Sequence, residues 1–477
     1  MEPSDDDTIG HLEGIVGAAH CFADVERMAP YLREARNLFA GLARVVVRPA
    51  TTDEVATVVR YCAERRLPVV PQGGNTGMCG AAVPQHRHAV VISTERLTRI
   101  RAVDPIDFTI TVEAGCILAD VQAAALAAGC FFPLSLGGEG SCRIGGNLST
   151  NAGGVNVLHY GNARDLTLGL EVVLPDGRVW HGLRSLRKDN TGYALKHLFV
   201  GAEGTLGLIT AAQLRLFPQP AERHTVFLAL PSPDAALQVL AAARRATGDA
   251  VTACELLPRI GLALGLQNMP GGRDPFGSPH PWYLLLEATS SRPGLLGDAL
   301  DDCLADALAA GWVVDAAVAR SEAQRQAFWR LREITAGGHQ WQEGGLVKHD
   351  VAVPVSRVAR FIAEATAAVE AAWPGVRTIA FGHVGDGNVH FNLVQPPDGD
   401  AAAFVAARAR FNAIVHDIVH ALDGSMSAEH GIGLLKIDEM ARYKSDVELD
   451  LMHRVKAALD PHGLMNPGKV LPVPRAR

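Results

Sequence analysis

The alternation of hydrophobic and polar positions changes character once along the chain, near residues 218–220. Before that point, short apolar runs alternate with glycine-rich stretches. Such runs predict strands, and apolar residues that recur every three to four positions predict helices. Strands are expected at residues 45–47, 68–71, 89–92, 109–112, 167–173 and 208–216, and helices at 52–65 and 118–128. This mixture predicts an α+β domain.

Beyond residue 220 the chain reads as Ala-rich helices alternating with strands. Strands are expected at 225–230, 250–257, 282–289 and 312–319, with helices at 234–247 and 294–310. Two β-α-β units in succession predict a ferredoxin-like second domain. A helix at 355–372, a strand pair at 378–383 and 388–394, and a helical region from residue 402 onward complete the pattern.

The composition favours a small substrate. With 477 residues the chain can form two or three domains, each with its own core. A net charge of −7 and the lack of any Lys and Arg run offer no electrostatic footprint for nucleic acid. No uncharged stretch is long enough for a membrane span, and the N-terminus lacks the features of a signal peptide. Eight scattered cysteines without a C-x-x-C pair fit reduced thiols, so a cytoplasmic protein is expected.

Glycine is concentrated at residues 73–80, 137–154 and 201–207. Because glycine permits close backbone approach, these clusters predict a chain wrapped around a ligand. In the first cluster a strand runs into small residues whose N–H groups can converge on an anion. No G-x-G-x-x-G occurs, so a Rossmann dinucleotide site has no support. Residues 463–469 approach a P-loop pattern, but Val470 stands where Ser or Thr must bind Mg²⁺, and we reject it.

Two histidines flank a predicted tight turn. Asp386 and Gly387 form a strong hairpin-turn pair, and a two-residue loop there would place His383 directly opposite His390. Side chains in such a pair have Cβ atoms about 4.5–5.5 Å apart, which lets two imidazoles hold one cation. Asn392 shares this face, because residues two apart in a strand point the same way. On these residues alone, a metal-dependent hydrolase is one alternative.

Motifs along nearly the whole chain resemble one enzyme family. PQGGNTG at 71–77, GGNLSTNAGG at 145–154 and VGAEGTLGLIT at 200–210 are similar to the FAD-binding domain of the vanillyl-alcohol oxidase/PCMH superfamily. FGHVGDGNVHFN, SAEHGIG and LDPHGLMNPGKVLP, which end at residues 392, 433 and 472, narrow the resemblance to the D-2-hydroxyacid dehydrogenase branch.

The resemblance implies an α+β fold with four parts. An N-terminal helical segment (1–40) would precede a PCMH-type, two-subdomain FAD-binding domain (41–220). A ferredoxin-like α+β cap domain (221–425) would bind substrate and metal. A C-terminal helical segment (426–477) would carry the Glu-His motif.

The resemblance also implies the residues that contact FAD. The first loop would hold the pyrophosphate by backbone amides, and the other clusters would surround the isoalloxazine and ribityl groups. Some relatives attach flavin covalently through a His where this chain has Asn75, so non-covalent FAD is expected. The implied FAD-binding residues are Pro71, Gln72, Gly73, Gly74, Asn75, Thr76, Gly77, Gly145, Gly146, Asn147, Ser149, Thr150, Asn151, Gly153, Gly154, Tyr160, Gly161, Glu203, Gly204, Gly207, Ile209 and Asn466.

By the same resemblance, His383, His390 and Glu429 bind Zn²⁺ or another divalent metal, and His430 is the catalytic base. Two nitrogen ligands and one carboxylate leave coordination positions open for a substrate. A 2-hydroxyacid bound there would give its hydroxyl proton to His430 and its C2 hydride to the flavin. Substrate contacts are implied for Arg332, Thr335, Lys348 and Asn392.

The resemblance also narrows the choice of substrate. Family members that act on D-2-hydroxyglutarate use a Lys at the position of Lys348, which relatives acting on glycolate or D-lactate tend to lack. The implied reaction is therefore D-2-hydroxyglutarate to 2-oxoglutarate. A D-lactate dehydrogenase and a catalytically silent flavoprotein are the alternatives. A separate electron acceptor, such as an electron-transfer flavoprotein or a quinone, is expected, and a homodimer is left open.

Overall fold

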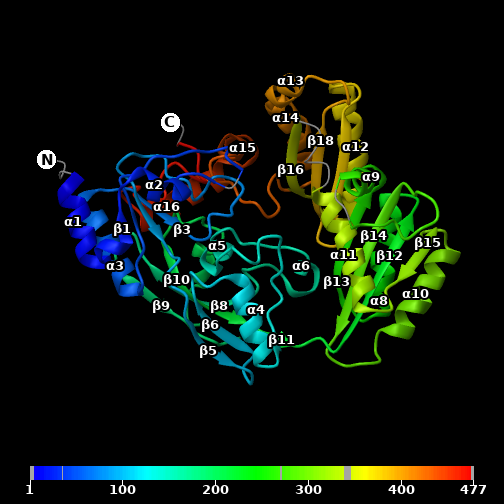
Figure 1. The fold of residues 1–477 in the computed structure, drawn as a ribbon, viewed down its shortest axis with the longest axis horizontal. Helices are drawn as coiled ribbons and strands as arrows, with labels where there is room; N and C mark the ends of the chain where they lie inside the picture. The colour runs from blue at the N-terminus through cyan, green and yellow to red at the C-terminus, as the bar shows by residue number, and fades with distance from the viewer. Residues whose placement is uncertain (1–4, 35, 269–270, 338–344, 474–477) are drawn as a thin grey trace. The chain divides into compact units, whose positions relative to one another are not determined.

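The computed structural model describes residues 5–34, 36–268, 271–337 and 345–473 (Figure 1). The chain divides into two compact units. The first unit contains Met1–Gly153, Gly161–Gln219 and Glu429–Arg477, and the second contains Gly154–Tyr160 and Pro220–Ala428. Among the described helices, none has the length and apolar character needed to cross a membrane.

A small, mainly parallel sheet forms one part of the first unit. Its strand order is β1-β2-β4-β3, with β2, β4 and β3 parallel and β1 antiparallel to β2. The Val-rich strands β2 and β4 are buried along their whole length, which is typical of a sheet covered on both faces. The bounds are β1 (Cys21–Phe22), β2 (Val45–Val47), β3 (Val69–Gln72) and β4 (Val90–Ser93).

Helices α1 (Asp5–Val16) and α3 (Thr52–Arg65) pack against this sheet in one apolar cluster. The predicted helix at 52–65 is confirmed. It begins where the Thr51 hydroxyl accepts the N–H of Glu54 at 3.1 Å, and it ends at Arg66, whose φ of 58° is left-handed. The C-terminal segment returns to the same cluster, because the fully buried Met465 bridges to Val69 of β3.

An antiparallel sheet of five strands completes the framework of the first unit. Its order is β5-β6-β10-β8-β9, and the predicted strands at 109–112, 167–173 and 208–216 are confirmed within one residue at their ends. The bounds are β5 (Ile100–Asp104), β6 (Thr109–Glu113), β8 (Thr167–Val173), β9 (Val179–Gly182) and β10 (Leu208–Arg215).

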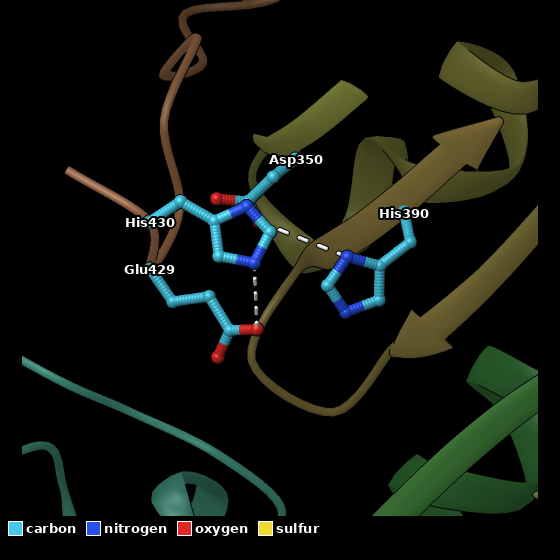
Figure 2. Close-up of side chains that lie close together, drawn as sticks. All are labelled: Asp350, His390, Glu429 and His430. Carbon is cyan, nitrogen blue, oxygen red and sulfur yellow. Dashed lines mark ion pairs between the residues drawn. The ribbon is translucent and has the colours of Figure 1, made fainter. Parts of the chain in front are cut away.

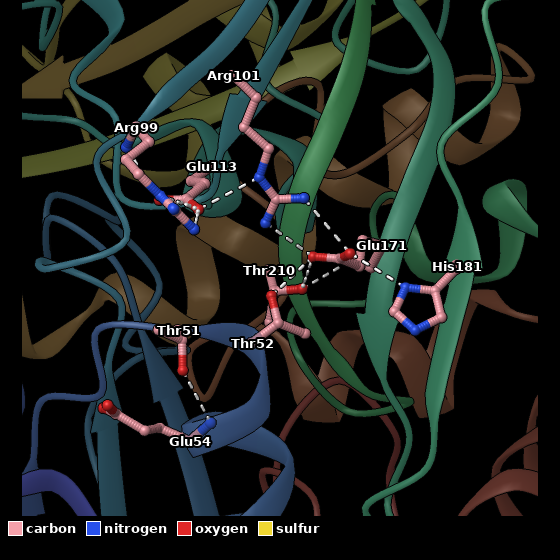
Figure 3. Close-up of polar contacts among 9 residues, drawn as sticks. All are labelled: Thr51, Thr52, Glu54, Arg99, Arg101, Glu113, Glu171, His181 and Thr210. Carbon is pink, nitrogen blue, oxygen red and sulfur yellow. Dashed lines mark hydrogen bonds and ion pairs between the residues drawn. The ribbon is translucent and has the colours of Figure 1, made fainter.

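A buried ion-pair network ties this sheet to α3 (Figure 3). Arg101 lies 3.0 Å from Glu171 and 3.2 Å from Glu113. The hydroxyl of Thr52, at the start of α3, donates to Glu171 at 2.7 Å. Burial alone would raise the pKa of Glu171, but Arg101 and the hydroxyl donors hold it at about 2. The Glu171 carboxylate therefore joins the two sheets through α3.

The first unit contains further short elements and two C-terminal helices. These are η1 (Ala18–His20), α2 (Val25–Met28), η2 (Ala29–Tyr31), α4 (Leu118–Ala127), β7 (Cys130–Phe131), α5 (Ile144–Ser149), α7 (Lys196–Phe199), β11 (Phe217–Pro218), α15 (Ile437–Tyr443) and α16 (Asp446–Leu459). The predicted helix at 118–128 corresponds to α4.

The second unit is built on a seven-stranded antiparallel sheet of order β15-β12-β14-β13-β17-β18-β16. The first four strands, with α8 (Pro233–Ala246) and α10 (Gly297–Ala309), form the expected pair of β-α-β units in ferredoxin-like order. The strand bounds are β12 (Glu222–Leu230), β13 (Val251–Pro258), β14 (Trp282–Ser290), β15 (Asp315–Val318), β16 (Leu346–Ala352), β17 (Arg377–His383) and β18 (Asn388–Val394).

The two faces of this sheet differ in character. One face packs α8, α10, α12 (Val358–Ala372) and α14 (Arg408–Ala421) into a large apolar core. The other face packs α9 (Arg259–Asn268) and α11 (Glu322–Gly337) against smaller apolar clusters, and it also carries the polar residues described below. The remaining elements are α6 (Val157–Tyr160), η4 (Val355–Arg357) and α13 (Ala401–Ala406).

The β17–β18 hairpin has a longer turn than predicted. β17 ends at His383 and β18 begins at Asn388, and the Asp386 side chain caps the turn by accepting the Asn388 N–H at 3.1 Å. Phe381, rather than His383, lies opposite His390, so the expected direct pairing is wrong. A shift of two residues preserves the face, and the two imidazole centroids lie 5.7 Å apart.

Candidate active site

The three glycine clusters of the first unit meet around one open cleft. The cleft lies where β3 ends, where α5 begins and at the turn before β10. The structure thus brings together segments that are far apart in sequence. The predicted residues that line the cleft are 71–77, Gly145, Gly146, Asn147, Ser149, Thr150, Glu203, Gly204, Gly207 and Ile209.

Backbone atoms form much of this cleft. A Cβ on Gly74 would lie 2.3 Å from the Ser141 carbonyl oxygen, so the packing of the loop requires glycine there. At Gly77 and Gly146, by contrast, an added Cβ would meet no atom within 4 Å, which leaves their backbone accessible. Exposed backbone in a glycine-rich loop after a strand suits the phosphates of a dinucleotide. The residues present therefore fit FAD.

Asn75 is held by the backbone of a neighbouring segment. Its φ is 54°, and its side-chain N–H₂ group donates to the carbonyl oxygens of Pro30 at 3.1 Å and Arg33 at 2.6 Å. The amide thus anchors the glycine-rich loop. An amide is also not a nucleophile of the kind that links flavin covalently, so nothing at this position conflicts with non-covalent FAD.

Some predicted FAD contacts lie outside the cleft lining, namely Asn151, Gly153, Gly154, Tyr160, Gly161 and Asn466. At least two of these hold loops in place. The side chain of Asn151 accepts the N–H of Arg164 at 2.9 Å, and the side chain of Asn466 donates to the carbonyl oxygen of Glu203 at 2.7 Å. The lining also contains Leu208 of the 200–210 motif and four residues that the sequence reasoning missed, Ala81, Ala82, Thr94 and Arg143. Ala81 directly follows the first glycine cluster and Arg143 lies within the second, whereas Thr94 has no such signal.

The second unit presents polar side chains on the sheet face opposite its main core. Lys348 of β16 pairs directly with Asn392 of β18, and Asp350 pairs with His390. These four residues share one face because side chains alternate along a strand. The predicted residues Lys348, His390 and Asn392 are therefore neighbours. Asp350, to which the sequence reasoning gave no role, is buried beside them and accepts the Asn388 side-chain N–H at 3.0 Å.

Glu255 of β13 is a second residue that the sequence reasoning missed. Its side chain is 1% exposed, and its two oxygens lie 2.5 Å from Nδ1 of His383 and 2.8 Å from Nε of Arg332. Burial would raise the pKa of Glu255, but the adjacent charges and hydrogen bonds of His383 and Arg332 hold it at about 2. Because Nδ1 of His383 faces this carboxylate, Nε2 is the ring nitrogen through which His383 would bind a metal.

Arg332 and Thr335 both lie on α11 but in different surroundings. The Arg332 guanidinium lies over Phe381, 5.6 Å from the ring centroid, and its Nη2 lies 3.5 Å from Nε2 of His383. Thr335 is fully buried, and its hydroxyl donates to the Leu331 carbonyl of its own helix at 2.8 Å. The structure therefore brings Arg332 to the predicted metal ligand His383, whereas Thr335 is packed within the helix layer.

Glu429 and His430 begin the last segment of the first unit, directly after Ala428 of the second. The Ala428 N–H donates to the Asp350 carbonyl oxygen at 3.3 Å. Figure 2 draws one ion pair within each unit: Glu429 with Nε2 of His430 at 3.7 Å, and Asp350 with Nδ1 of His390 at 3.9 Å.

Comparisons with known proteins extend over the same regions. Residues 43–182 match the FAD binding domain family, and residues 219–470 match the family of FAD linked oxidases, C-terminal domain. D-2-hydroxyglutarate dehydrogenase of Bos taurus is 37% identical over 98% of this chain and 84% of its own length. The protein of the same name from Stutzerimonas stutzeri is 34% identical over 97% of this chain and 98% of its own.

Solved structures show the same fold at low identity. A p-cresol methylhydroxylase structure aligns with a TM-score of 0.77 at 18% identity, over 97% of this chain and 96% of its own. An alkyldihydroxyacetonephosphate synthase aligns at 0.73 and 16% identity, over 98% of this chain and 85% of its own. The chain belongs to the FAD-linked oxidase family. Within that family it is a flavin-dependent dehydrogenase, which removes the hydrolase alternative.

Proposed function

We propose that the protein oxidises D-2-hydroxyglutarate to 2-oxoglutarate with FAD and a divalent metal. The observation that carries this proposal is the position of Lys348, on the sheet face of His390 and directly opposite Asn392. A diacid substrate needs a cation for its second carboxylate, because burying an unpaired charge is costly. The names of full-length relatives support the same substrate.

The cleft of the first unit is the proposed FAD site. When bound, FAD supplies the acceptor for the hydride that leaves C2 of the substrate. The loop at 71–77 would offer its backbone N–H groups to the phosphates, and residues 145–150 and 203–209 would line the remainder of the cofactor. The site residues outside the lining, such as Asn466, would act by holding these loops.

His383, His390 and Glu429 are the proposed metal ligands. When bound, a divalent metal such as Zn²⁺ supplies a Lewis acid that lowers the pKa of the substrate hydroxyl. Glu255 supports this assignment, because its contact with Nδ1 fixes the tautomer of His383 and directs Nε2 outward from the carboxylate. The same carboxylate also holds Arg332 beside the site.

His430 is the proposed base. An imidazole can accept a proton near neutral pH, so His430 would take the hydroxyl proton as the C2–H bond breaks. Lys348 would bind the distal carboxylate, and Asn392 and Arg332 are proposed as further substrate contacts. Thr335, whose buried hydroxyl bonds within α11, would support the helix that carries Arg332. Since Glu255 occupies Nε of Arg332, only the remaining N–H groups of that guanidinium can reach a carboxylate.

A separate carrier, an electron-transfer flavoprotein or a quinone, is the proposed electron acceptor, and a cytoplasmic site of action is proposed from the sequence. D-Lactate oxidation is the alternative activity. The test is a panel of D-2-hydroxyacids assayed with an artificial acceptor dye. The proposal expects the highest kcat/KM for D-2-hydroxyglutarate and a low value for D-lactate. A preference for D-lactate or another monoacid would overturn the substrate assignment.

A further inference from the structure

Glu203 joins the proposed FAD cleft to the segment that carries His430. It lies in the turn before β10 with a φ of 49°, it lines the cleft, and its side chain is buried. Its two carboxylate oxygens contact the backbone of the last segment. One accepts the N–H of Ile432 at 2.7 Å, and the other accepts the N–H of Gly433 at 2.9 Å. All of these residues belong to the first unit.

The segment that follows His430 fits closely onto these oxygens. Gly431 has a φ of +78°, and a Cβ there would lie 2.8 Å from Oε1 of Glu203. Gly433 has a φ of +53°, and a Cβ there would lie 2.1 Å from the Cys79 carbonyl oxygen. Two glycines with left-handed backbone therefore let the chain turn tightly over Glu203. Side chains at either position would displace it.

Two buried side chains of the C-terminal segment, Asn466 and Lys469, hold the backbone at Glu203 in place. The side chain of Asn466 donates to the Glu203 carbonyl oxygen at 2.7 Å and to that of Ala81 at 3.0 Å. The Lys469 ammonium donates to the carbonyl oxygens of Ala81 and Val83 and to the side chain of Asn466, all within 2.9 Å. Through these hydrogen bonds, Asn466 and Lys469 fix the position of the turn that contains Glu203.

We propose that Glu203 is a positioning residue that sets the place of His430 relative to the flavin. A carboxylate that accepts two consecutive N–H groups fixes both the position and the direction of the backbone two and three residues after the base. Glu203 also lines the proposed FAD cleft. One residue therefore contacts both the cleft and the segment that carries His430, and so fixes the position of the base relative to the cofactor. This inference rests on the proposed role of His430 as base.

The test compares Glu203→Gln with wild type and with the matched control Glu64→Gln, which changes an exposed carboxylate of α3. An amide can accept only through one oxygen, so one of the two N–H groups loses its partner. Hydrogen exchange of the Ile432 and Gly433 amides should quicken roughly fivefold or more. Turnover per bound flavin with the dye acceptor should fall roughly 10- to 100-fold in kcat, with little change in KM. The solvent deuterium isotope effect on flavin reduction should rise, because proton transfer to a misplaced base becomes slower.

Gly431→Ala provides a second variant that leaves Glu203 intact. Its added Cβ at positive φ should press on Oε1 and produce the same loss in kcat and the same rise in isotope effect. Unchanged amide exchange in Glu203→Gln would overturn the anchoring contact. Faster exchange with unchanged kcat and isotope effect would overturn the positioning role. His430→Ala distinguishes failure of the proposed base from failure of the Glu203 contact. If that variant retains wild-type kcat, His430 is not the base. The exchange of the Ile432 and Gly433 amides in Glu203→Gln still tests the Glu203 contact.

Discussion

The two units recognise their proposed ligands by different means. The cleft of the first unit is shaped by backbone, with glycine required at Gly74 and left-handed geometry at Asn75 and Glu203. The polar face of the second unit is built from side chains on paired strands, where Lys348 meets Asn392 and Asp350 meets His390. A backbone cleft suits a cofactor held in the same way in many enzymes, whereas side chains can be exchanged to suit a substrate.

Buried ion pairs occur in both units. On the polar face of the second unit, Glu255 is buried in contact with His383 and Arg332. Removing one member leaves the others buried without compensation, which is costly. We therefore expect substitutions on the sheet face to affect turnover strongly while leaving the flavin in place.

The largest expected effect is the loss of turnover when the metal is removed. Thorough chelation, His383→Ala and His390→Ala should each lower kcat by roughly 10³-fold or more, because the Lewis acid is lost. Bound FAD, measured by absorbance of the flavin and released by acid precipitation, should stay at the wild-type level. His420→Ala, on an exposed part of α14, serves as the control. Near-normal kcat after chelation would show that the sheet face holds no catalytic metal.

The next effect concerns the base. His430→Ala should lower kcat by roughly 10²- to 10⁴-fold with metal and FAD retained, since a positioned general base contributes about that much. Glu429→Ala should instead lose metal, as measured by elemental analysis of the purified protein. If His430→Ala lost metal and Glu429→Ala did not, the roles of the two neighbours would be reversed.

Lys348→Met should separate substrate recognition from chemistry. The variant should lower kcat/KM for D-2-hydroxyglutarate roughly 100-fold, because the distal carboxylate loses its cation. The value for D-lactate should change little, since a methyl group needs no cation. Lys188→Met, an exposed lysine of the first unit, is the control. An equal loss for both substrates would mean that Lys348 supports the sheet face rather than reading the substrate.

The smallest effect is on stability and belongs to the first unit. The pKa of Glu171 is about 2 in the folded protein, against 4.5 for the group in isolation. A depressed pKa stabilises the fold above about pH 4.5, and this contribution is lost as the pH falls toward 2. Glu171→Gln should therefore lower the free energy of urea unfolding by roughly 2–3 kcal/mol at pH 7.

The difference between Glu171→Gln and wild type should shrink at acid pH. Glu26→Gln, at an exposed position of α2, should show neither change. If Glu171→Gln lowered the free energy of unfolding by the same amount at pH 7 and pH 3, the carboxylate would not be held charged by Arg101 and Thr52.

The sequence predicted the backbone-built region better than the side-chain-built one. Glycine motifs are local, so the segments around residues 73, 145 and 204 could be placed on one ligand before the fold was known. The ferredoxin-like arrangement was also predicted from the alternation of strands and helices along the chain, and the structure confirms it. Lining residues such as Thr94 carry no local pattern, because they reach the cleft only through tertiary packing.

Glu255 and Asp350 were missed for a physical reason. Glu255 is a single acid in a largely apolar strand, whereas Asp350 follows Lys348 and His349 in β16. The role of each depends on which strand lies beside it. Glu255 reaches His383 only because β13 pairs with β17 across 128 residues of sequence. The predicted register of the β17–β18 hairpin was wrong because it assumed a two-residue loop at Asp-Gly. The turn has four residues instead, and the Asp386 side chain stabilises it by accepting the Asn388 N–H.

We propose that the bound flavin receives the C2 hydride of D-2-hydroxyglutarate. Anaerobic mixing of the holoenzyme with D-2-hydroxyglutarate in a stopped-flow spectrophotometer tests this hydride transfer without any added acceptor. We expect the oxidised flavin band to bleach in a single turnover, with one 2-oxoglutarate formed per FAD, and D-lactate to bleach it far more slowly. If the oxidised band persisted with D-2-hydroxyglutarate, or D-lactate bleached it faster, the proposed hydride donor would be wrong.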